Sequence, residues 1–129
     1  MKSSFGQTAS VSRDLFVQDI PTGARSVSDI DGDWRPSPLQ FGRDRVIAAI
    51  TSLVPTADFS DPSWGSVELP GVSVEVNVGD ANPLMGFALH VREAEPGAAD
   101  MFIRRLLVTL QADAFDSSAE GGIFRRASA

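Results

Sequence analysis

The chain has 129 residues, no cysteine, and 17 acidic against 11 basic residues, so its net charge is −6. This length predicts one domain, and the lack of cysteine excludes disulfides, thiolate metal ligands and a cysteine nucleophile. Nucleic acids and anionic membranes are bound through clustered Lys and Arg, so the acidic balance argues against both as partners.

The first residues do not resemble a secretory signal, because Met1-Lys2 is followed by polar residues instead of an apolar run. No stretch approaches the roughly 20 apolar residues that cross a bilayer. We therefore expect a cytoplasmic protein. Lys2 is the single lysine beside ten arginines, a bias typical of a GC-rich bacterial genome.

Residues 1–40 are rich in Ser, Asp, Gly and Pro, and their apolar residues are mostly isolated. Pro36 and Pro38 exclude a helix interior there. We interpret this region as a flexible N-terminal arm that leads to Trp34. Its one apolar cluster, Leu15-Phe16-Val17, either docks as a short strand or stays loose.

A helix is predicted from about Gly42, since apolar residues then recur at helical spacing up to Pro55. Three strands are predicted next, at 66–69, 72–78 and about 84–92. The last two alternate strictly, with Val72, Val74, Val76 and Val78 on one face. A period of two is typical of half-buried antiparallel strands.

A second helix is predicted over 98–111, apolar around most of its girth, with Arg104 and Arg105 on the solvent side. Residues 112–116 offer an optional edge strand through Phe115. Residues 117–129 are expected to form a disordered tail. The expected fold is a small α+β two-layer sandwich with an antiparallel three- to four-stranded sheet and two helices on one face. Its order is α-β-β-β-α with an optional final β, in a single domain over residues 41–116.

His90 is the one histidine, so any acid–base role of an imidazole falls on it. Strand alternation places it on the polar face with Arg92. Glu75 and Asn77 reach the same face if the two strands pair in simple register. No serine has the setting of a nucleophile elbow, so we interpret His90 as a polar residue on an exposed sheet face.

Other recognisable sites are missing from the sequence. Asp29, Asp31 and Asp33 are spaced like the start of a calcium loop, but Trp34 and Gln40 replace the Gly and Glu that such a loop requires. Neither a phosphate-binding glycine loop nor a zinc-binding histidine pair occurs. We therefore expect no metal and no cofactor.

Trp64, in a turn after Asp61-Pro62, either projects as an interface anchor or packs beneath the first helix, and we favour the packed placement because buried aromatic residues dominate small cores. The speculative binding surface is then Trp64, Glu75, Asn77, His90 and Arg92.

Three classes of function stay open. We favour a non-enzymatic acidic binding or inhibitor module whose protein partner has a basic surface, an immunity-like protein being one form. The second is a small enzyme that uses His90 with Glu75 or Glu68. The third is an assembly subunit that pairs through the polar sheet face or the edge near Phe115. The sequence leaves the oligomeric state open.

Overall fold

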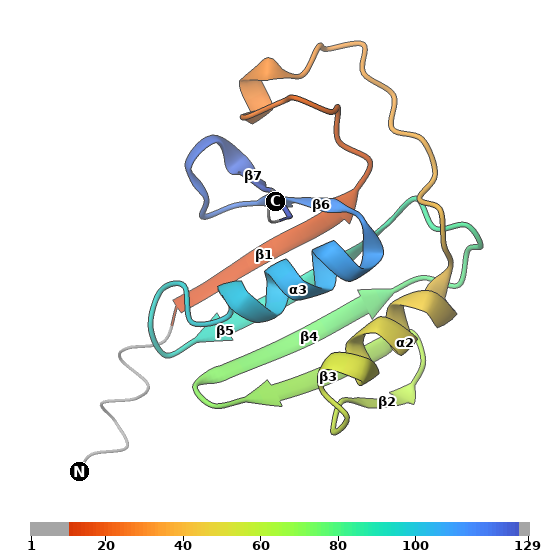
Figure 1. Ribbon diagram of the computed structural model, residues 1–129, viewed down its shortest axis with the longest axis vertical. Coiled ribbons are helices and arrows are strands. Elements are labelled where there is room, and N and C mark those ends of the chain that lie inside the picture. The colour runs from red at the N-terminus through yellow and green to blue at the C-terminus, as the bar shows by residue number, and fades with distance from the viewer. Residues whose placement is uncertain (1–10, 127–129) are drawn as a thin grey trace.

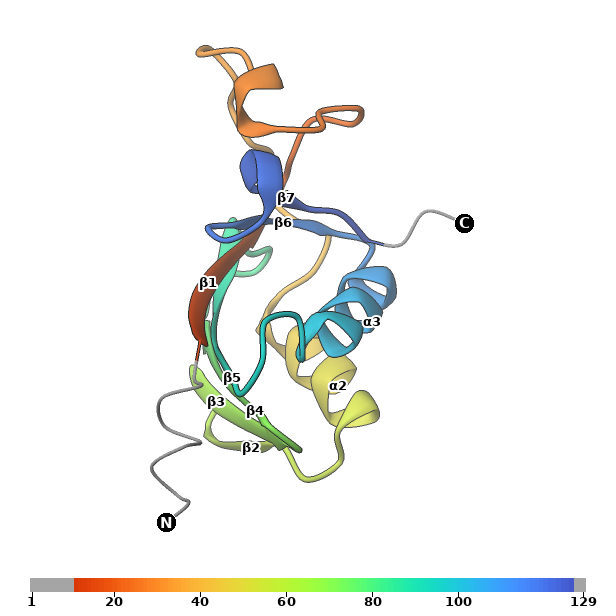
Figure 2. The same ribbon diagram turned by 90° about the vertical axis from the view of Figure 1, so that its left-hand side faces the viewer.

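The computed structural model describes residues 11–126, where two helices lie on one side of a seven-stranded antiparallel sheet (Figures 1 and 2). The helices are α2 (Arg43–Leu53) and α3 (Asp100–Leu110). The strands lie in the order β2-β3-β4-β5-β1-β6-β7. Their bounds are Val11–Gln18 (β1), Asp58–Asp61 (β2), Trp64–Leu69 (β3), Val72–Val78 (β4), Gly86–Glu93 (β5), Asp113–Asp116 (β6) and Ile123–Phe124 (β7). Two 3₁₀ turns, η1 (Val27–Asp29) and η2 (Glu120–Gly122), complete the elements.

The valine-rich hairpin is confirmed, and it forms the middle of the sheet. β4 and β5 pair antiparallel in simple register, with Glu75 opposite His90 and Val76 opposite Leu89. The valines of β4 are buried, whereas Glu75 and Asn77 are exposed. Alternation therefore separates a core face from a solvent face, as the sequence predicts.

Both predicted helices are confirmed, and each packs its apolar side on the core face of the sheet. Val46 and Ile50 of α2 and Ile103, Leu106 and Leu107 of α3 are fully buried in one cluster with the β4 valines. Within residues 11–126, no helix has the length and hydropathy to cross a bilayer.

The sheet is larger than the three to four strands predicted, and its largest addition is β1. The sequence pattern places residues 11–18 in the N-terminal arm. In the structure these residues form β1, which lies between β5 and β6 in the sheet. Leu15 and Val17 alternate inward, but Arg13 also points inward and Phe16 points outward. These two residues hide the alternation, because they place a charge in the core and an aromatic ring on the surface. Residues 1–10 of the predicted arm lie outside the described residues.

The C-terminal segment also differs from its prediction. β6 is confirmed as a strand, but it is internal because β7, from the predicted tail, pairs with its far side. Arg125 holds this end in place: it donates to Asp113 (2.7 Å) and to the carbonyls of Pro21 (2.8 Å) and Ala24 (3.1 Å). This mostly polar segment is thus held by the hydrogen bonds of Arg125 together with the burial of Ile123 and Phe124. Residues 127–129 lie outside the described residues.

The inward guanidinium of Arg13 binds three carboxylates from three other elements. It donates to Glu93 of β5 (3.0 Å), to Asp116 of β6 (2.9 Å) and to Asp100 at the start of α3. Burial lowers the pKa of Arg13, but the hydrogen bond to Asp100 and the charges of Asp116 and Glu93 outweigh it, so the pKa is raised. Arg13 is only 8% exposed and stays charged, so its carboxylate partners are required.

Replacing the cation without shortening the side chain isolates its contribution. Arg13→Met leaves Glu93 and Asp116 buried without a counter-charge, so we expect the free energy of unfolding to fall by about 3 kcal/mol or more. Urea denaturation measures this, with the exposed Arg92→Met as the matched control, expected within about 0.5 kcal/mol of the wild type. Equal stability of the two variants would contradict the role of Arg13.

The anchoring of the C-terminal segment has its own test. Arg125→Ala removes side-chain bonds to Asp113 and to two carbonyls, so amide exchange at Ile123 and Phe124 should accelerate. Arg126→Ala is the matched control, because the Arg126 side chain reaches Asp113 only at 3.4 Å. Hydrogen exchange followed by mass spectrometry should show faster exchange in the first variant alone.

Candidate functional site

The candidate site is the outward face of the sheet, on the side away from α2 and α3 (Figure 2). Residues directly opposite each other on paired strands share a face. Trp64 is opposite Asn77, Glu75 is opposite His90, and Ser73 is opposite Arg92. The structure therefore brings the five residues proposed from the sequence, Trp64, Glu75, Asn77, His90 and Arg92, onto one surface.

His90 lies between two carboxylates in the row that crosses β4, β5 and β1. Glu75 is its register partner on β4, and Asp14 is its register partner on β1. The Nδ1 atom of His90 lies 2.9 Å from Oδ1 of Asp14. The two side chains are 37% and 53% exposed, so the pair stands on an open surface. A contact between two side chains this exposed contributes little to folding stability.

Two aromatic side chains border this charged row. The Trp64 ring stacks on the His90 ring with centroids 6.0 Å apart and planes inclined by 22°. Trp64 is 44% exposed, so of its two expected placements the outward one is observed. Phe16 of β1 is 47% exposed and lies in the next row, opposite Ala88 and Phe115. Exposed aromatic rings beside charged groups are typical of interface anchors.

A shallow concavity of about 390 Å³ lies over the charged rows. It is lined by Ser12, Asp14, Ser73, Glu75, His90 and Arg92. Ser73 donates to Glu68 (2.9 Å), so its hydroxyl is engaged away from the imidazole. Among residues 11–126, Asp14 is the one side chain that hydrogen-bonds to His90. The concavity thus holds an imidazole hydrogen-bonded to a carboxylate, together with an arginine and two serines.

Sequence reasoning missed the contribution of β1 to this surface. Ser12, Asp14 and Phe16 all point outward from that strand. Leu15 and Val17 are two residues apart, and continuing this period of two places Asp14 outward. Phe16, which lies between them, weakens the signal because it is apolar and yet points outward. Conversely, Asn77 shares the face but does not line the concavity.

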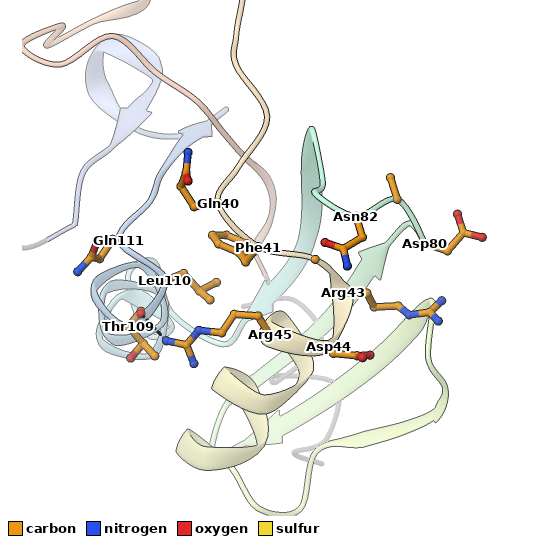
Figure 3. Close-up of a pocket in the computed structure, with 12 residues that line it drawn as sticks. Gln40, Phe41, Arg43, Asp44, Arg45, Asp80, Asn82, Thr109, Leu110 and Gln111 are labelled. Carbon is orange, nitrogen blue, oxygen red and sulfur yellow. Dashed lines mark hydrogen bonds between the residues drawn. The ribbon is translucent and has the colours of Figure 1, made fainter.

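A larger cavity of about 690 Å³ lies on another side, at the start of α2 (Figure 3). Figure 3 shows Arg45 directed to Thr109, whose carbonyl accepts its hydrogen bond (3.0 Å), while Arg43 extends in the opposite direction. Arg43 donates to Ser63 (3.1 Å). Both arginines therefore have partners within the protein, and the acidic Asp44 and Asp80 also line this cavity.

The acidic turn at 29–33 does not form a metal site. The carboxylate of Asp29 accepts the backbone N–H groups of Arg25 (2.9 Å) and Ser26 (3.2 Å), so it caps η1. Across residues 11–126, no group of three His, Asp or Glu side chains is arranged to hold a metal ion.

Comparisons with protein-family models, with curated proteins and with solved structures find no match to this chain. The functional argument consequently rests on the geometry of the described residues.

The placement of the two tryptophans is directly testable. Trp64 is 44% exposed, whereas Trp34 is half-buried and its indole Nε1 is fully buried. Acrylamide should therefore quench the fluorescence of Trp34→Phe, in which Trp64 emits, more strongly than that of Trp64→Phe. The reverse order would show that Trp64 is covered, and the outward face would lose its aromatic anchor.

Proposed function

We propose that this protein is a non-enzymatic binding module that captures a protein with a basic surface through the outward face of its sheet. The observation that carries the proposal is the exposed Trp64 ring stacked on His90, next to carboxylates on both sides of that histidine. A rigid aromatic side chain gives contact area at a small entropic cost, and the carboxylates select the charge of the partner.

The charge of this face agrees with the choice of partner. On strands β1, β3, β4 and β5, Asp14, Glu68 and Glu75 project from it, against Arg92. The chain as a whole carries a charge of −6, so its long-range field also attracts cationic surfaces. A lysine or arginine of the partner would in addition find the face of Trp64 available for a cation–π contact. An inhibitor of immunity type that occludes a basic enzyme or toxin fits this description.

The edges of the sheet support side-chain recognition in preference to strand pairing. The edge strands are β2 and β7, with four and two residues. Phe115, expected from the sequence at an edge, lies on β6, which is paired on both sides. Short edges offer little backbone for an added strand. The strand that carries Phe115 has no free edge through which a second chain could pair.

The test of the proposed function uses the full chain as bait in a lysate of its native organism, with mass spectrometry of the captured proteins. Glu75→Ala/Arg92→Ala should lose the captured partner while its melting temperature stays within about 2 °C of the wild type, because both residues are exposed. Glu95→Ala/Arg35→Ala changes the same charges at exposed positions elsewhere and should keep the partner. Equal capture by both double variants would refute this face as the binding surface.

One observation favours a second candidate, a small enzyme in which His90 acts as a general base. Asp14 lies 2.9 Å from Nδ1, an arrangement that orients the ring and leaves Nε2 to accept a proton. In that case Asp14→Asn and His90→Gln should reduce turnover of a substrate to a similar extent. In the binding module, Asp14→Asn weakens partner capture and no turnover is lost.

A further inference from the structure

A second surface lies on the helical side of the protein, opposite the outward sheet face (Figure 2). Met101, Arg104, Arg105 and Val108 follow one another at the spacing i, i+3, i+4 and i+7 in α3, so they form one stripe on the helix. All four are exposed, Met101 by 65% and Val108 by 47%. The opposite side of α3 supplies the core, so this stripe is a separate surface of the same helix.

The stripe borders a groove of about 390 Å³ between α3 and the end of α2. Leu53 of α2 and Thr109 complete its lining. Two large exposed apolar side chains, Met101 and Val108, therefore lie on one groove, where a single partner segment would contact both. The groove is therefore a candidate docking surface.

The charge of the groove is opposite to that of the protein. Within residues 11–126, neither Arg104 nor Arg105 forms an ion pair, and no carboxylate lines the groove. The guanidinium of Arg104 lies 5.1 Å from the centroid of the Phe124 ring, a contact that fixes its position. Stacked on a ring, a guanidinium still offers its N–H donors to a carboxylate.

We propose that this groove binds an acidic amphipathic helix of a partner protein. Two apolar positions seven residues apart on α3 span about 10 Å, which is two helical turns. An apolar helix face with anchors at i, i+4 and i+7 matches that span, and flanking glutamates or aspartates pair with Arg104 and Arg105. This surface is separate from the sheet face. It selects an acidic partner, whereas the sheet face selects a basic one.

A synthetic peptide provides the probe. We suggest a fluorescein-labelled peptide of about 14 residues, with leucines at i, i+4 and i+7 and glutamates at the flanking positions, followed by fluorescence anisotropy with the full-length protein. A second peptide carries lysine in place of every glutamate. We expect saturable binding of the glutamate peptide, weakening with added salt, and at least about tenfold weaker binding of the lysine peptide.

Protein variants locate the site. Arg104→Glu/Arg105→Glu should weaken binding of the glutamate peptide at least about tenfold. Arg25→Glu/Arg35→Glu introduces the same charge change at exposed positions elsewhere and should leave binding within about twofold of the wild type. Since Arg104 also contacts Phe124, Arg105→Glu alone and Met101→Ser provide variants that keep this contact, and each should weaken binding with an unchanged melting curve.

The outcomes are decisive in either direction. Failure of the glutamate peptide to bind, equal binding of the two peptides, or equal weakening by the two double variants would each overturn the proposal. Glu75 and Arg92 do not line the groove, so the Glu75→Ala/Arg92→Ala variant should bind the glutamate peptide like the wild type. This variant separates the groove from the proposed function of the sheet face.

Discussion

Arg13 occupies an inward position of β1, where alternation would place an apolar side chain, and its guanidinium joins three carboxylates from β5, β6 and α3. Glu93 also accepts the backbone N–H of Ala99 (2.8 Å), so the same cluster fixes the beginning of α3. Because a buried charge tolerates no missing partner, β1 has one acceptable register between its neighbours. That register turns Asp14, the next residue, outward and places it beside His90. The candidate site thus depends on an ion cluster on the other side of the sheet.

The sequence was informative wherever a segment had one strong period. The valines of β4 and the apolar residues of α2 follow a single repeat, and α3 is an apolar segment of helical length, so these elements, their order and the polar face of the central hairpin were predictable. The apolar girth expected of α3 is wrong at Met101 and Val108, which are exposed on the side away from the sheet. β1 and β7 were not, because long-range charge pairs order them: Arg13 pairs with Glu93 and Asp116, and Arg125 with Asp113. Such pairs leave no periodic trace, since their members lie up to 103 residues apart.

The same limit applied to the site. Glu75, His90 and Arg92 could be placed together because a hairpin joins their strands directly. Asp14 could not, because it is 76 residues from His90 and belongs to a strand that the sequence did not reveal. The stacking of Trp64 on His90 was equally hidden, since the ring reaches past β4 to a side chain on β5.

The two surfaces of the molecule differ in charge. The net charge sums over the whole chain and does not show this difference. Asp14, Glu68 and Glu75 make the sheet side acidic, whereas Arg104 and Arg105 make the groove beside α3 basic. A pI near 4.6 therefore describes neither surface by itself. The net charge acts on the rate of encounter, whereas the local charge of each surface governs close contact, because exposed charges more than about 8 Å apart are largely screened at physiological salt.

The strict separation of inward from outward side chains in β3, β4 and β5 has an evolutionary consequence. Mutations at Ser66, Glu75 or Arg92 can accumulate without disturbing the valine layer beneath, so the pattern displayed to other molecules is free to diverge rapidly while the scaffold is conserved.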